Sequence, residues 1–182
     1  AVDTLVALHR HSRAAEVALS AYDTAAFIDE ALLLVDWYLP WRNADFTGGE
    51  SCVERFVQAW TDVFEALPPA PDTLVLRDFH VDNLMPLSGR HGVAACGLLD
   101  FQDALIGPSA YDLVSLLEDA RRDVCGELSL DMRSRYYMAM DLVPDQVAAF
   151  ESWYRVLGAQ RHCKVLGIFV RLWRRDGKDT YL

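Results

Sequence analysis

Strand-like segments are confined to one short stretch of the chain, and this restriction narrows the possible folds more than any other sequence feature. Residues 74–76, 84–87 and 93–99 are brief apolar runs, and the last two read as a hairpin around the glycine-containing turn at 88–92. Strands so few and so short cannot form the main core. On both sides of them, apolar residues recur at helical spacing. The sequence therefore predicts a mainly α domain with a small β insert, an α+β arrangement.

The helical patterns also suggest where the helices begin and end. Pro40 is expected to stop the second helix, Ser109 to cap a later one, and Gly158 to break the pattern that begins at Pro144. We expect helices in the segments 5–18, 27–38, 53–64, 113–117, 132–140, 144–157 and 165–172.

Length and composition limit the kind of protein. The 182 residues suit one domain, and the formal net charge of −10 argues against nucleic acid as the main partner. The chain contains neither an apolar run of membrane-spanning length nor a signal-peptide pattern. Its four cysteines are far apart, so we expect reduced thiols in a cytoplasmic protein. The chain starts in a helix-like pattern and stops without a clear cap, so we expect a piece of a longer protein.

Three polar residues stand where the short strands end. Asp78 follows the first apolar run, Asn83 comes five residues later, and Asp100 follows the third run. Side chains at strand ends are held by a rigid scaffold and directed into clefts. Mg²⁺ prefers a few hard oxygen ligands shared with substrate phosphates. One carboxylate and one amide oxygen meet that need, which leaves a second carboxylate to orient a hydroxyl nucleophile.

The strings around these residues carry a resemblance to a known family. Residues 74–85 read LVLRDFHVDNLM, residues 99–108 read LDFQDALIGP, and residues 111–114 read YDLV. They resemble the aminoglycoside phosphotransferase and choline kinase-like small-molecule kinases, over a span from Leu74 to Val124. Within that family they look closest to the bacterial anomeric kinases of N-acetylmuramate and N-acetylglucosamine, which serve cell-wall recycling.

The resemblance implies a protein kinase-like C-terminal lobe and assigns roles to single residues. Asp78 would be the catalytic base, and Asn83 and Asp100 would be the ligands of Mg²⁺. Asp112 would brace the catalytic loop. Apart from the resemblance, the position of His80 between Asp78 and Asp82 suggests either a metal ligand or a histidine that braces the loop, and its two ring nitrogens favour the bracing role. ATP and a small-molecule acceptor would be the substrates.

Other charged residues near these strings carry less specific signals. Arg122, next to Arg121, is a candidate for binding a sugar carboxylate, although a solvated helix end is an equal reading. Asp82 and Asp103 are better read as turn formers.

The sequence also departs from the family in two ways. Arg77 stands where the aminoglycoside enzymes have the glycine of a His-Gly-Asp motif, which weakens the antibiotic-resistance interpretation. The chain has neither a glycine-rich loop nor a strand lysine, since Lys164 and Lys178 are its only lysines and lie near its end. We therefore expect residues 1–182 to be the catalytic and acceptor-binding lobe, without the N-terminal ATP lobe, and to be inactive alone.

Three other functions remain open at this point. An aminoglycoside or other alcohol kinase would use the same chemistry with a different acceptor pocket, which helices before Pro69 and after Gly126 would build. A catalytically dead kinase-like binding module would fit if the missing lobe lacked its lysine. A metal-dependent phosphohydrolase would use water as the nucleophile.

Overall fold

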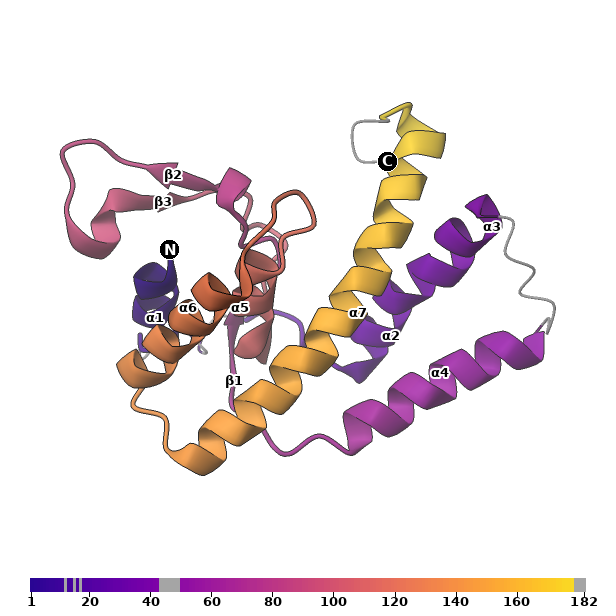
Figure 1. Cartoon of the computed structure of the whole chain (residues 1–182), viewed down its shortest axis with the longest axis horizontal. Coiled ribbons are helices and arrows are strands. Elements are labelled where there is room, and N and C mark those ends of the chain that lie inside the picture. Colours follow the sequence, from indigo (N-terminus) through magenta and orange to yellow (C-terminus); the bar gives the residue numbers. More distant parts are fainter. Residues whose placement is uncertain (12, 15, 17, 43–49, 179–182) are drawn as a thin grey trace. The chain divides into compact units, whose positions relative to one another are not determined.

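The computed structural model describes residues 1–182 except 12, 15, 17, 43–49 and 179–182. Within the described residues the chain forms two compact units, one made of Ala1–Tyr22 and Pro68–Arg155 and the other of Asp23–Leu67 and Val156–Leu182. Helices dominate, and the strands are short and confined to the first unit (Figure 1). The predicted mainly α fold with a small β portion is confirmed.

The first unit contains all of the strands found among the described residues. Its elements are α1 (Val2–His9), β1 (Asp72–Val75), β2 (Leu84–Pro86), β3 (Cys96–Leu98), β4 (Leu105–Pro108), α5 (Ala110–Leu117), α6 (Gly126–Ala139) and the first part of α7 (Pro144–Asp176). Short 3-10 turns at Val81–Asn83 and Gly92–Ala95 precede β2 and β3. β2 pairs antiparallel with β3, so the predicted hairpin is confirmed, while β1 pairs antiparallel with β4.

The core of the first unit is built around α5. Every residue of this helix is buried, and the ring of Tyr111 packs edge-on against Tyr22 with the centroids 4.8 Å apart. The strand before it, β4, needs a glycine, since a Cβ at Gly107 would lie 2.9 Å from the Cβ of Tyr22. This close packing fixes the position of α5 against β1 and β4.

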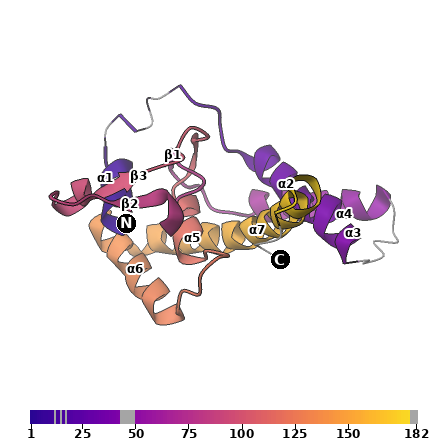
Figure 2. The ribbon, with the colours of Figure 1, turned by 90° about the horizontal axis from the view of Figure 1, so that it is seen from above.

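The second unit consists of helices. It contains α2 (Thr24–Leu33), a π-helical turn (Leu34–Tyr38), α3 (Leu39–Trp41), α4 (Glu50–Glu65) and the second part of α7. α2 runs beside this part of α7 (Figures 1 and 2), and the buried ion pair between Lys164 Nζ and Glu30 Oε1, 2.8 Å apart, joins them. The rings of Phe27 and Phe64 stack between α2 and α4.

Several predicted helix limits are wrong. The helical segment continues one residue beyond Pro40 and ends at Trp41, because the wider π-helical turn before Pro40 accommodates a residue without an N–H. Gly158 does not break α7, since tertiary packing outweighs the roughly 1 kcal/mol cost of an interior glycine. Ser109 precedes α5, but its side chain makes no capping hydrogen bond. The first helix ends at His9, and part of the expected 5–18 segment lies outside the described residues.

Candidate active site

The pairing of β1 with β4 brings two of the predicted functional segments together. In this antiparallel pair Asp72 lies opposite Pro108 and Val75 opposite Leu105, so the end of β1 meets the start of β4. Asp78 follows β1, and the segment 100–104 leads into β4. The guanidinium of Arg77 also reaches this segment, where it donates a hydrogen bond of 3.5 Å to the carbonyl oxygen of Asp103.

The β2–β3 hairpin brings the two predicted metal ligands, Asn83 and Asp100, to one end of the same pair of strands. Leu84 lies opposite Leu98, and the N–H of Leu99 donates to the carbonyl of Asn83 over 2.9 Å, which extends the ladder by one step beyond the strands. Asp100 is the next residue. Asn83 and Asp100 therefore lie at the open end of one hairpin, although they are 17 residues apart in the sequence.

The loop from Asp78 to Asn83 is tightly hydrogen-bonded within itself. The N–H of His80 donates to the carbonyl of Asp78 over 3.0 Å, and the N–H of Asn83 donates to the carbonyl of His80 over 2.9 Å. The side-chain amide of Asn83 also donates to the carbonyl of Asp78, over 2.9 Å. Because its nitrogen makes this contact, the amide oxygen of Asn83 is turned away from that carbonyl, and an oxygen in this position suits a hard metal ion.

Asp112 holds the start of the loop from α5. One carboxylate oxygen accepts the N–H of Leu76 at 2.7 Å and the other accepts the N–H of Arg77 at 2.9 Å. Arg77 has a positive φ of 69°, which a non-glycine residue adopts only under strain. Since Asp112 is fully buried, these two charge-assisted hydrogen bonds form away from water and offset that strain.

His80 and Asp100 occupy different surroundings. His80 is buried, and its Nε2 lies 3.4 Å from the side-chain nitrogen of Asn83, a position beside the loop that fits the predicted bracing role. Asp100 is exposed, has a positive φ of 56°, and accepts a hydrogen bond of 2.6 Å from the side-chain amide of Gln102. This contact engages one oxygen of the Asp100 carboxylate, so the metal-ligand role predicted for Asp100 would fall to the other oxygen.

The donor set fits a magnesium ion. Asn83 offers an amide oxygen and Asp100 a carboxylate oxygen, which are hard ligands of the kind that Mg²⁺ takes in small number beside water and phosphate. Asp78, the third polar residue, precedes the same hairpin. Among the described residues no group of three or more histidine, cysteine, aspartate or glutamate side chains is placed to hold a metal by itself.

Arg122 is engaged with the loop. Its guanidinium lies 2.6 Å from a carboxylate oxygen of Asp82, in a pair that is about half exposed on both sides. The hydrogen bond from Arg122 lowers the pKa of Asp82 below its usual range. The interpretation of Asp82 as a turn former does not account for this pair, because no local pattern joins two residues 40 positions apart. The structure thus places Arg122 beside the loop, and a substrate contact for it stays a prediction.

The chain also matches a known protein family. The sequence model of the phosphotransferase enzyme family (APH) matches residues 1–157. The chain belongs to this family. The predicted family resemblance is therefore confirmed.

The relatives in this family carry a common name. The chain is 42% identical, over its whole length, to an N-acetylmuramate/N-acetylglucosamine kinase of Neisseria meningitidis serogroup B, of which it covers 53%. It is 34% identical to the kinase of the same name from Caulobacter vibrioides, and the match covers 90% of this chain and 44% of that protein. It is also 34% identical to the kinase of that name from Pseudomonas aeruginosa, where the match covers all of this chain and 53% of that protein. The chain spans about half the length of these curated relatives.

Two further findings concern the helices and the cysteines of the chain. No helix in the described part of the structure has both the length and the apolar composition that crossing a membrane requires. Cys52, Cys96, Cys125 and Cys163 are free thiols.

Proposed function

We propose that the protein carrying this chain is an ATP-dependent kinase of N-acetylated amino sugars, which transfers the γ-phosphate to the anomeric hydroxyl of N-acetylmuramate or N-acetylglucosamine. The observation that carries the proposal is the meeting of Asp78, Asn83 and Asp100 around the open end of one hairpin. The names of the relatives support the choice of acceptor. We also propose a cytoplasmic location, where ATP is abundant and thiols stay reduced.

In the proposed reaction Asp78 is the general base. Its carboxylate orients the sugar hydroxyl and accepts its proton, while the bond from that oxygen to the γ-phosphorus forms and the bond from phosphorus to the leaving oxygen of ADP breaks. Asn83 and Asp100 would hold Mg²⁺. When bound there, a magnesium ion neutralises negative charge on the phosphates. Asp112 keeps the backbone before Asp78 in place through the N–H groups of Leu76 and Arg77.

The proposal is tested by substitution in the full-length protein. ADP release with Mg-ATP is measured with N-acetylmuramate, with N-acetylglucosamine and with an aminoglycoside as acceptor. Asp78→Asn is expected to lower kcat by roughly 10²–10⁴. Asp100→Asn is expected to raise the Mg²⁺ concentration needed for half-maximal activity. Asp103→Asn, an exposed residue of the same segment, is the matched control and should keep the parent rate.

The possible outcomes separate the candidate functions. Transfer only to the aminoglycoside would move the protein to the resistance enzymes, and ADP release without any acceptor would indicate a phosphohydrolase. An Asp78→Asn enzyme at the parent rate would remove Asp78 from the chemistry.

A further inference from the structure

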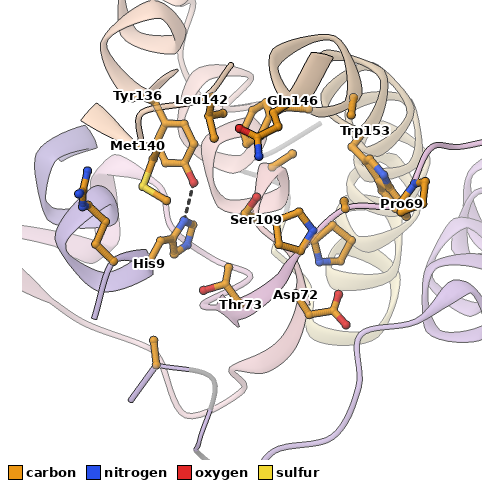
Figure 3. Close-up of a pocket in the computed structure, with 18 of the residues that line it drawn as sticks. His9, Pro69, Asp72, Thr73, Ser109, Tyr136, Met140, Leu142, Gln146 and Trp153 are labelled. Carbon is orange, nitrogen blue, oxygen red and sulfur yellow. Dashed lines mark hydrogen bonds between the residues drawn. The ribbon is translucent and has the colours of Figure 1, made fainter. Parts of the chain in front are cut away.

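A cavity of about 460 Å³ lies in the first unit, away from the candidate active site. Figure 3 shows His9, Thr73, Ser109, Tyr136 and Trp153 among the side chains around it. We propose that this cavity is a second binding site, for a small uncharged aromatic molecule, and that its occupant stabilises the catalytic loop through β1 and α5.

The cavity and the active site lie at opposite ends of β1. Asp72 and Thr73, at the start of this strand, line the cavity, whereas Asp78 follows its end. The strand itself spans about 10 Å at roughly 3.3 Å per residue. Among the described residues, those that line the cavity include none from 76–83 or 100–103. A molecule in the cavity therefore cannot present a hydroxyl to Asp78, so this is a different site from that of the phosphate acceptor.

Aromatic side chains form part of the mostly apolar wall of the cavity, and each of them is held by a contact of its own. The indole nitrogen of Trp153 donates to the carbonyl of Pro68 over 2.8 Å. The hydroxyl of Tyr136 lies 2.7 Å from Nδ1 of His9, and its ring packs against Phe150 with the centroids 5.2 Å apart. A preformed apolar site of this volume is typical of pockets that bind small molecules, and flat aromatic walls favour a flat aromatic guest.

The charges of the lining favour an uncharged guest. Arg10 already pairs with Asp141 at 2.7 Å, and Asp72 is exposed to solvent at the cavity rim. Burial lowers the pKa of His9 to about 4, so its imidazole is neutral at neutral pH. Ser109 and Thr73 are neutral hydroxyl groups in the lining (Figure 3) that can bind one polar edge of the ring.

Two elements connect the cavity to the catalytic loop. β1 starts in the lining and leads directly to Leu76 and Arg77. α5 starts in the lining with Ala110, and Asp112, one residue after Tyr111, accepts the N–H groups of Leu76 and Arg77. A guest that holds the starts of β1 and α5 together therefore opposes local unfolding, in which the hydrogen bonds from the N–H groups of Leu76 and Arg77 to Asp112 break. The linkage is measurable as slower hydrogen exchange of those two amides.

The experiment uses the full-length protein with indole as the probe. Binding is followed by two-dimensional amide NMR, and exchange of the Leu76 and Arg77 amides is measured in parallel. We expect a Kd below about 1 mM, a value within reach of an aromatic molecule of this size. At an indole concentration ten times the Kd, exchange of the two amides should slow by up to about 11-fold.

Two matched variants locate the guest. Ala149→Phe places a ring inside the cavity and is expected to weaken indole binding by about tenfold or more, since the two rings compete for the same wall. Ala148→Phe places the same side chain on the exposed neighbouring position of α7 and should leave the Kd within about twofold. Leu142→Trp narrows the cavity from the loop before α7 and serves if Ala149→Phe fails to fold.

Each outcome decides one part of the proposal. Absence of saturable binding up to about 5 mM indole, or equal binding by the Ala149→Phe and Ala148→Phe proteins, would overturn the site. Binding without slower exchange at Leu76 and Arg77 would overturn the link to the loop. Neither readout uses phosphate transfer, so the result stands apart from the outcome for the proposed function.

Discussion

The contact between Asp112 and the backbone before Asp78 offers a quantitative test of how the active site is held. Asp112→Asn preserves the shape of the side chain but replaces one acceptor oxygen by an NH₂ group. That group would face the N–H of either Leu76 or Arg77, which lie 2.7 and 2.9 Å from the two carboxylate oxygens. One buried donor then loses its acceptor, and the other keeps a neutral bond in place of a charge-assisted one.

The cost can be estimated from these two changes. A buried donor without an acceptor costs about 1–3 kcal/mol, and the weakened second bond adds about 1 kcal/mol. Since loss of the buried carboxylate also removes its desolvation cost, we expect a net destabilisation of about 2–3 kcal/mol. For a protein of this size or larger, that corresponds to a fall in the unfolding midpoint of about 4–12 °C.

The assay compares thermal unfolding of the parent, Asp112→Asn and Asp103→Asn proteins at one pH. Asp103 is an exposed carboxylate in the segment before β4, so its substitution should leave the midpoint unchanged. The amides of Leu76 and Arg77 should also exchange faster in the Asp112→Asn protein. A midpoint within about 1 °C of the parent, with unchanged exchange at both amides, would refute the bracing role.

Three further predictions follow from the structure. Burial lowers the pKa of His9 from 6.5 to about 4. Between pH 6.5 and pH 4, the imidazole of His9 is therefore protonated in the unfolded chain but not in the folded chain. Stability should therefore fall as the pH decreases from about 6.5 to 4, by on the order of 3 kcal/mol, and His9→Gln should lack this part of the pH dependence in urea unfolding. Gly167→Ala should lower the unfolding midpoint strongly, because the new Cβ would overlap the backbone carbonyl of Leu33, while Gly126→Ala, in open space, should be nearly neutral; equal midpoints would contradict the close packing. Residues 1–182 alone should release no ADP from Mg-ATP with an amino sugar, and full activity of this chain would disprove the need for a further ATP-binding lobe.

Local patterns in the sequence were sufficient to predict much of the secondary structure. The helix predicted over 27–38 is present as α2 and the π-helical turn after it, and the structure adds a cap, since the carboxylate of Asp23 accepts the N–H of Ala26 at 3.0 Å. The β2–β3 hairpin was visible because two apolar runs flank a glycine-containing turn. These features depend on residues near one another in the chain.

Features that depend on distant residues were not predictable in this way. β4 contains Gly107 and Pro108 and was missed, because its pairing with β1 is set by the packing around Tyr22 and Tyr111. Gly167 was not singled out, yet it gives α7 the space to approach the backbone of Leu33.

The candidate site was predicted because its residues have recognisable spacing. Asp78, Asn83 and Asp100 were selected from the strand ends and from the family resemblance, and the pairing of β2 with β3 gives the latter two a common location. The pair of Arg122 with Asp82 was not predicted, since no local pattern joins residues 40 positions apart.

The most direct test of the central claim is the identity of the product. The full-length protein is incubated with Mg-ATP and N-acetylmuramate, and phosphorus NMR follows the products before and after mild acid, with the Asp78→Asn protein as the control. The account predicts a new sugar phosphate signal that mild acid abolishes, as expected for phosphate on the anomeric oxygen, and that the Asp78→Asn protein does not form at the parent rate. An acid-stable product, or the same product formed at the parent rate by the Asp78→Asn protein, would contradict it.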